Sequence, residues 1–153
     1  MNKEQFIHID ENGDKRYYAD REMTILHRED GPAVEYANGN KEWYINDKLH
    51  REDGPAVEYI NGYKAWWLND ELHREDGPAA VYANGSKFWY TNGKLHREDG
   101  PAHESANGFK AWYINGEHLT EEEFNTRMNP VELTLDEIAA KFGVSVDKLK
   151  IKK

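Results

Sequence analysis

Four copies of one eight-residue block hold most of the side chains that could carry out chemistry. The block is Leu-His-Arg-Glu-Asp-Gly-Pro-Ala, at 26–33, 49–56, 72–79 and 95–102. Histidine beside aspartate or glutamate suggests a metal site, because imidazole and carboxylate groups ligate zinc. Each histidine, however, belongs to a separate copy, and two ligands within one copy make a poor site. We therefore expect no metal and no other cofactor. A structural role in the repeat is assigned instead to His27, His50, His73 and His96.

The composition also argues against catalysis. The chain has no cysteine and only three serines, so few side chains could act as a nucleophile. General acid–base catalysis needs two groups whose surroundings separate their pKa values, whereas the carboxylates here recur four times in nearly identical settings. Neither a glycine-rich phosphate loop nor a Ser-His-Asp set at a recognisable spacing is present. We expect a protein without enzymatic activity.

Charge and hydropathy narrow the class of protein further. The 153 residues include 20 Lys and Arg against 29 Asp and Glu, a formal net charge of −9. An acidic chain is a poor nucleic-acid binder, because affinity for a polyanion comes largely from cationic side chains. No apolar run approaches the roughly 20 residues that span a bilayer, and the first residues lack the pattern of a signal peptide. These features predict a cytoplasmic protein with no membrane partner.

The elements that must position these residues follow from an internal repeat with a constant step of 23 residues. Between the blocks, Asn-Gly recurs, followed by Lys, Trp, a second aromatic residue and then Asn-Asp or Asn-Gly. Asn-Gly flanked by short aromatic stretches is a strong β-hairpin signal, and the proline of each block ends a strand. The chain is therefore predicted to be mainly β, an elongated antiparallel hairpin array. With two strands per unit, equivalent residues would lie roughly 10 Å apart.

Two-residue loops at both turns would set the register of each hairpin. Val34 would then lie opposite Trp43, and Tyr44 opposite Leu49. Because side chains alternate between faces, one face would collect Val34, Tyr36, Trp43, Ile45 and His50. The other would collect Ala33, Tyr44, Leu49, Glu35, Glu42 and Arg51.

This 23-residue hairpin unit, with its Asn-Gly, Trp-Tyr and second Asn-Gly, resembles the MORN repeat class over residues 12–119. The Leu-His-Arg-Glu-Asp-Gly-Pro-Ala block is similar to a variant found in bacteriophage and large-virus proteins. The block replaces the glycine-rich pattern of standard MORN repeats, so lipid or kinase associations do not transfer. The resemblance implies a phage-encoded, anti-defence or antitoxin-like protein that binds and inhibits a host protein in the host cytoplasm.

Three segments are expected: an N-terminal cap with a degenerate hairpin at 1–25, four β-repeats at 26–119, and a helical segment at 120–153. Capping boxes at 120–123 and 134–137 predict two helices, and Gly143 would end the second. The stretch 138–145 resembles the core of a helix-turn-helix, whose recognition helix would be 146–153. That tail could instead belong to a strand. A cap over the last repeat is the favoured interpretation.

Aromatic and arginine side chains are the candidate partner-binding residues, because both types are enriched at interface hot spots. Some of these positions also vary between the repeats, and positions required for folding should not vary. The candidates are Tyr44, Tyr63, Trp67, Phe88, Tyr90, Phe109, Tyr113, Arg51, Arg74 and Arg97. A structural role is expected for the constant tryptophans Trp43, Trp66, Trp89 and Trp112.

Alternatives to host-protein binding remain open. A small anionic ligand, such as a nucleotide signal, could be held between the arginines and the aromatic side chains. The acidic surface could mimic DNA, the C-terminal segment could read DNA as a helix-turn-helix, and regularly spaced aromatics could bind carbohydrate. The repeat could also support a homo-oligomer.

Overall fold

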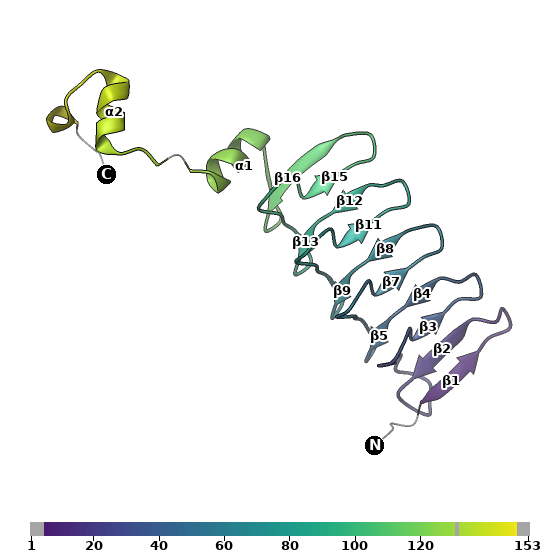
Figure 1. Ribbon diagram of the computed structural model, residues 1–153. Coiled ribbons are helices and arrows are strands. Elements are labelled where there is room, and N and C mark those ends of the chain that lie inside the picture. The colour runs from purple at the N-terminus through teal and green to yellow at the C-terminus, as the bar shows by residue number, and fades with distance from the viewer. Residues whose placement is uncertain (1–4, 131, 150–153) are drawn as a thin grey trace.

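The computed structural model describes residues 5–130 and 132–149, which form a long β-array followed by two short helices (Figure 1). The strands of the first two hairpin units are β1 (Phe6–Ile9), β2 (Lys15–Tyr18), β3 (Val34–Glu35), β4 (Lys41–Glu42), β5 (Tyr44–Ile45) and β6 (Lys48–Leu49). Those that follow are β7 (Val57–Glu58), β8 (Lys64–Ala65), β9 (Trp67–Leu68), β10 (Glu71–Leu72), β11 (Ala80–Val81), β12 (Lys87–Phe88), β13 (Tyr90–Thr91), β14 (Lys94–Leu95), β15 (His103–Glu104), β16 (Lys110–Ile114) and β17 (Glu117–Leu119). The helices are α1 (Glu121–Met128), α2 (Leu135–Phe142) and the 3₁₀ helix η1 (Val146–Lys148).

One antiparallel sheet of eleven strands runs the length of the array, in the order β1-β2-β3-β4-β7-β8-β11-β12-β15-β16-β17. Each of the first three repeats adds two strands to this sheet and one small hairpin beside it, β5–β6, β9–β10 or β13–β14, whereas the last repeat ends in β16 and β17, which both belong to the sheet. Figure 1 shows the hairpins side by side along one axis. The predicted mainly β hairpin array is confirmed, and this arrangement is compatible with a MORN-like repeat.

The second turn of each repeat has the predicted geometry. Asn46 and Asp47 both have positive φ, at 51° and 63°, as a type I′ turn requires. Tyr44 pairs with Leu49, and the equivalent residues of the next two repeats pair in the same way. Asparagine tolerates this left-handed conformation better than most residues do, which accounts for its presence in every copy of the turn.

The first turn differs from the prediction by one residue. Tyr36 donates its backbone N–H to the carbonyl of Asn40, so the loop contains three residues, of which only Gly39 has a positive φ, at 93°. Val34 consequently pairs with Glu42 and not with Trp43. Because a one-residue slip moves side chains to the other face of a sheet, the predicted faces were wrong: Glu42 lies on the side of Val34.

The centre of the array is built from small side chains. Ala33, Ala56, Ala79 and Ala102 are fully buried. The carbonyl oxygen of each accepts the backbone N–H of the aromatic residue in the preceding unit, as Ala56 does from Trp43 at 2.8 Å. An alanine at this position lets the backbones of neighbouring units approach closely, and a larger side chain would separate them.

Helix α1 closes the C-terminal end of the array. Phe124 packs with Ile114 and Leu119 of the last hairpin in a buried cluster, to which Trp112 and Met128 add. Both predicted capping boxes form, and Gly143 ends α2 in the left-handed conformation. Helix α1 therefore covers the last repeat, whereas α2 packs against η1 and lies beyond α1 in Figure 1.

The described part of the suggested recognition helix, 146–149, contains only the 3₁₀ helix Val146–Lys148. Residues 150–153 of that prediction lie outside the described residues. Within the described part of the chain, no helix has the length and apolar character needed to traverse a lipid bilayer.

Candidate binding surfaces

Arginines of the repeated block form a stack along one side of the sheet, called here the arginine stack (Arg28, Arg51, Arg74 and Arg97). The guanidinium carbon of each lies 4.0–4.2 Å from the centre of an aromatic ring: Tyr17, Trp43, Trp66 and Trp89, respectively. This distance is well within the range of cation–π attraction. The arginine side chain of each block therefore covers an aromatic ring.

Hydrogen bonds fix each guanidinium in place. Arg51 donates from Nε to Asp53 at 2.8 Å, and from Nη1 to the carbonyl of Pro55 and to Glu58, each at 3.2 Å. The hydrogen bond from Arg51 lowers the pKa of Asp53. On its other side the guanidinium lies against Gly54, where an added Cβ would come within 2.9 Å of the guanidinium carbon. The arginine is thus held between a ring and a glycine.

One repeat lacks part of this network. Arg28, Arg51 and Arg97 each pair with a glutamate seven residues later, but Arg74 faces Val81 at that position. Val81, which stands where the other repeats have glutamate, also interrupts a row of alternating charges across the sheet, because it lies between Lys64 and Lys87. Opposite charges on neighbouring strands stabilise a sheet, so the third repeat is the least well paired on this side.

The predicted partner-binding arginines therefore have internal partners. The side chains of Arg51, Arg74 and Arg97 are only 21–24% exposed. Their donors point to carboxylates and carbonyls of their own loops. The ring under each guanidinium belongs to the preceding unit, so the cation–π contact joins neighbouring repeats and accounts for the presence of arginine in every copy of the block.

Each histidine of the block lies within hydrogen-bond distance of the asparagine that opens the second turn of its repeat. Nδ1 of His27 accepts the backbone N–H of Asn46 at 3.2 Å, and His73 and His96 receive equivalent bonds from the asparagines 19 residues later. Nδ1 of His50 lies 3.1 Å from the side-chain oxygen of Asn69. Among the residues that the structure describes, no three His, Asp or Glu side chains are grouped so that they could hold a metal ion.

Open grooves separate successive blocks on this side. Those between successive blocks from Arg28 to Asp99 have volumes of about 780, 550 and 650 Å³, in chain order. Tryptophan and arginine side chains line them, together with Glu-Asp pairs whose carboxylates are mostly exposed. Open, polar grooves of this kind differ from the closed pocket in which a small ligand would be buried.

On the opposite side of the sheet, six rings form a continuous chain of contacts, called here the ring ladder (Tyr59, Tyr63, Tyr82, Phe88, His103 and Phe109). Successive ring centres lie 5.6, 5.0, 5.4, 4.1 and 5.5 Å apart. The shortest contact is the stacking of Phe88 on His103, which are also cross-strand partners. Distances of this size are typical of aromatic pairs that stabilise each other.

Three of the predicted binding residues, Tyr63, Phe88 and Phe109, belong to the ring ladder. The other three, Tyr59, Tyr82 and His103, were not predicted. The most exposed of the ladder rings are Phe109, at 56%, and Tyr82, at 46%. Tyr59, Tyr82 and His103 were missed because the strand register of the first turn was predicted wrongly. With a three-residue loop, residues 59 and 63 are opposite each other, so both tyrosines of that hairpin belong to one surface.

A buried carboxylate marks the N-terminal end of the same side. Glu42 is 8% exposed and accepts hydrogen bonds from the phenols of Tyr36, Tyr44 and Tyr59, at 3.3, 3.1 and 2.7 Å. Burial and then the neighbouring carboxylate raise the pKa of Tyr44, whereas the hydrogen bond to Glu42 is the main cause that raises the pKa of Tyr59. At the equivalent positions of later repeats stand Ala65, Phe88 and Ala111.

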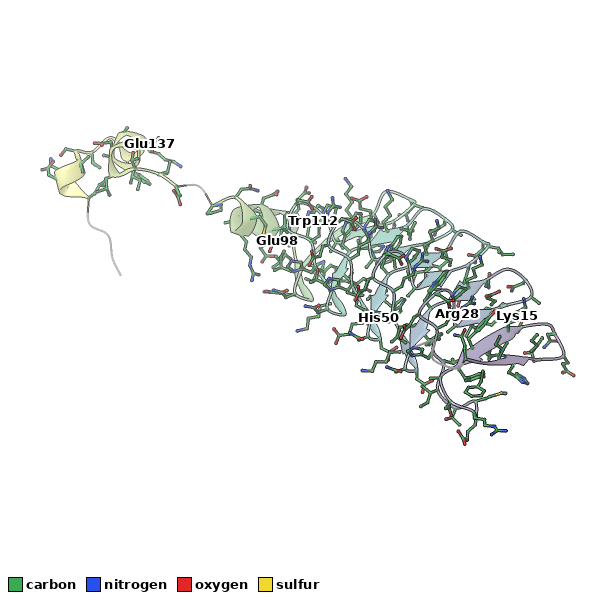
Figure 2. The ribbon with its side chains drawn as sticks, turned by 60° about the horizontal axis from the view of Figure 1, so that its bottom comes forward. Lys15, Arg28, His50, Glu98, Trp112 and Glu137 are labelled. Atoms are coloured by element: carbon green, nitrogen blue, oxygen red, sulfur yellow. The ribbon has the colours of Figure 1, made fainter. Side chains whose placement is uncertain are left out.

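The other predicted rings flank this side. Tyr90 lies near enough to Tyr82 and Tyr113 for their charges to influence its ionisation, although burial is the main cause that raises its pKa. Trp67 replaces tyrosine in the second repeat, and its Nε1 is buried with no hydrogen-bond partner among the described residues. Figure 2 shows side chains covering the array around Trp112 and Arg28, while the segment that carries Glu137 stands apart.

No protein-family model matches the sequence, and a search of curated proteins gives no match. The resemblance to MORN repeats consequently depends on the residues of the repeat and on the hairpin array described above.

Proposed function

We propose that this chain is a non-enzymatic binding protein that docks a partner protein on the ring ladder. The observation that supports the proposal is the continuity of six aromatic rings on one side of the sheet, with Tyr82 and Phe109 about half exposed at its surface. Aromatic side chains lose little conformational entropy on binding and contribute strongly to protein interfaces. Contiguous exposed rings on a soluble protein are typical of an interaction site.

The shape of this surface favours a protein partner over a small ligand. The rings follow the sheet across three repeats, and a partner protein can contact such an extended area. The alternative, capture of an anionic ligand by Arg51, Arg74 or Arg97, would require donors that already bond to Asp53 and its equivalents. Since these arginines lie on the side of the sheet opposite to the ring ladder, one small ligand would not contact both.

The finer proposal is that the protein is encoded by a phage and inhibits a host protein in the host cytoplasm, in an anti-defence or antitoxin-like role. It follows from the resemblance of the His-Arg-Glu-Asp block to phage and large-virus repeats. The absence of a recognisable catalytic motif in the sequence agrees with inhibition by binding.

Native mass spectrometry of tagged protein recovered from a bacterial lysate tests this function. We expect a protein-sized mass addition that is lost in the double variant Tyr82→Ser, Phe109→Ser, because both rings are exposed at the proposed surface; circular dichroism checks that this variant still folds. The matched control is Glu52→Gln, Glu75→Gln, which changes two exposed side chains on the opposite side and should keep the addition. Loss in the control but not in the ring variant would contradict the proposal. An addition of a few hundred daltons would support ligand capture instead.

A further inference from the structure

The N-terminal strand of the sheet has an outer edge with which no other described strand pairs. β1 is the first strand of the eleven and pairs only with β2 among the described residues. The other end of the array, by contrast, is covered by α1, which packs on β16 and β17. The two ends of the sheet therefore differ: one is closed by a helix, and the other exposes backbone groups that could pair with another strand.

The hydrogen-bond pattern identifies these backbone groups. In the first hairpin, Asp10 donates its backbone N–H to the carbonyl of Asp14. Because bonded pairs alternate in an antiparallel ladder, His8 and Phe6 also direct their N–H and C=O groups toward β2. The backbone groups of the residues between them, Ile7 and Ile9, therefore point away from the sheet. They form a short row of donors and acceptors at the edge.

The side chains of β1 suit pairing and do not obstruct it. Ile7 and Ile9 are 49% and 59% exposed, and both lie on the side that carries the arginine stack. The strand sequence Phe-Ile-His-Ile contains no lysine, proline or bulge, which are the features by which exposed edges normally avoid pairing. Two apolar β-branched residues at an open edge favour a partner strand that presents apolar residues in return.

We propose that β1 pairs with β1 of a second copy of this chain, antiparallel and about a two-fold axis at His8. Ile7 then lies opposite Ile9 of the second copy, and Ile9 opposite its Ile7, so each apolar side chain meets an apolar side chain and each outward backbone group finds a partner. When β1 pairs with β1 of a second copy in this way, all of its outward backbone groups form hydrogen bonds, so no strand of another protein is required. The pairing continues the antiparallel order of the eleven-stranded sheet.

This arrangement has a consequence for binding. Residues opposite each other across strands lie on the same side of a sheet, so the ring ladders of both copies would lie on the same side of the joined sheet. A partner with two equivalent sites could then engage both, which raises avidity without new contacts. The dimer itself does not rest on the proposed function, because its argument uses only β1.

Single cysteines test the pairing directly, because the chain has no cysteine of its own. In the proposed register His8 lies opposite His8 of the second copy, as a non-bonded pair with Cα atoms about 4.5 Å apart, within the range that a disulfide spans. We expect His8→Cys to form a disulfide-linked dimer under mild oxidation. The control is Glu11→Cys at the exposed hairpin tip, which would lie roughly 20 Å from its counterpart and should not cross-link.

Sedimentation velocity of the unmodified chain should show twice the 17.8 kDa mass of the monomer at about 100 µM. Ile9→Lys should weaken the dimer by more than about tenfold, because it places a charge at the pairing edge; circular dichroism checks that this variant still folds. A monomeric protein, a dimer that survives Ile9→Lys and Ile7→Lys, or a His8→Cys variant that cross-links no better than Glu11→Cys would each overturn the proposal.

Discussion

The glycine of the second block offers the sharpest test of the arginine stack. Gly54→Ala would place a Cβ 2.9 Å from the guanidinium carbon of Arg51, closer than two such atoms can remain. The structure gives Gly54 no positive φ, so alanine is not excluded by backbone strain. The flexible end of the arginine must therefore move off Trp43.

The cost of this movement can be worked out from the contacts that are lost. Cation–π attraction contributes about 0.5–1 kcal/mol at exposed sites, which is a lower limit for the mostly covered guanidinium of Arg51. The hydrogen bond to the carbonyl of Pro55 contributes about 0.5–1.5 kcal/mol, and the ion pair with Glu58 about 0.2–1 kcal/mol. The contact with Asp53 adds little, because that carboxylate is 84% exposed. Gly54→Ala should therefore lower the free energy of unfolding by about 1–3 kcal/mol.

A double-mutant cycle with Arg51→Ala, measured by urea denaturation, separates this cause from a general effect on the loop. Once the arginine side chain is gone, Gly54→Ala should be neutral, or should stabilise by up to about 1 kcal/mol by reducing the freedom of the unfolded chain. Gly77→Ala, where the same contact is 3.2 Å, should cost less than Gly54→Ala. Equal destabilisation by Gly54→Ala with and without the arginine would refute the reasoning.

Four further outcomes are expected. Val81→Glu should raise the free energy of unfolding by about 0.5–1 kcal/mol, because it supplies the missing carboxylate of the third repeat; thermal denaturation checks this. Glu42→Gln should cost about 1–2 kcal/mol in the same assay, since the phenols lose a charged acceptor, and it should lower the alkaline midpoint of Tyr59 in an ultraviolet titration. Tyr59 keeps its proton in the folded state above the usual tyrosine pKa of about 10. The stability that this residue contributes is therefore complete below that pH and is lost as the pH rises through the raised pKa of the folded state. Measurements of the free energy of unfolding between pH 8 and about 12 should show this decline. Thr120→Ala should destabilise the array by about 1 kcal/mol, whereas Thr134→Ala, in the helix beyond the cap, should leave the unfolding of the array unchanged.

Local signals explain which parts of the fold could be predicted. The turn at Asn46-Asp47 and the capping box at Thr120 depend on a few neighbouring residues, and both have the expected geometry. The turn at Asn38-Gly39 has an equally strong hairpin signal, but Asn-Gly fits both a two-residue loop and a three-residue loop that ends in a left-handed glycine. Local sequence does not distinguish these two loops, so the register and both faces were wrong together.

The candidate surface was only partly predictable for a related reason. Variation between repeats pointed to Tyr63, Trp67, Phe88 and Phe109, and the structure places all of these except Trp67 in one chain of contacts with three further rings. Repetition alone did not distinguish rings of the ladder from rings that arginine covers, because this depends on contacts between residues of different hairpins. The position of Arg51 over Trp43 is one such contact.

The two sides of the sheet differ in what a substitution there would disturb. On the arginine side, the block residues serve contacts that hold the array together: the guanidinium lies on a ring of the preceding unit, histidine accepts a backbone N–H from the turn that follows, and glycine leaves room for the guanidinium. A change at the arginine or at the glycine therefore weakens the contact between two units. Rings of the ladder contact one another only through side chains, and the hydrogen bonds of the sheet do not depend on their identity. Residues at ladder positions can therefore differ between repeats without loss of the fold, as Glu42, Ala65, Phe88 and Ala111 do. That freedom is what a binding surface needs, since it lets the recognised partner change while the scaffold stays the same.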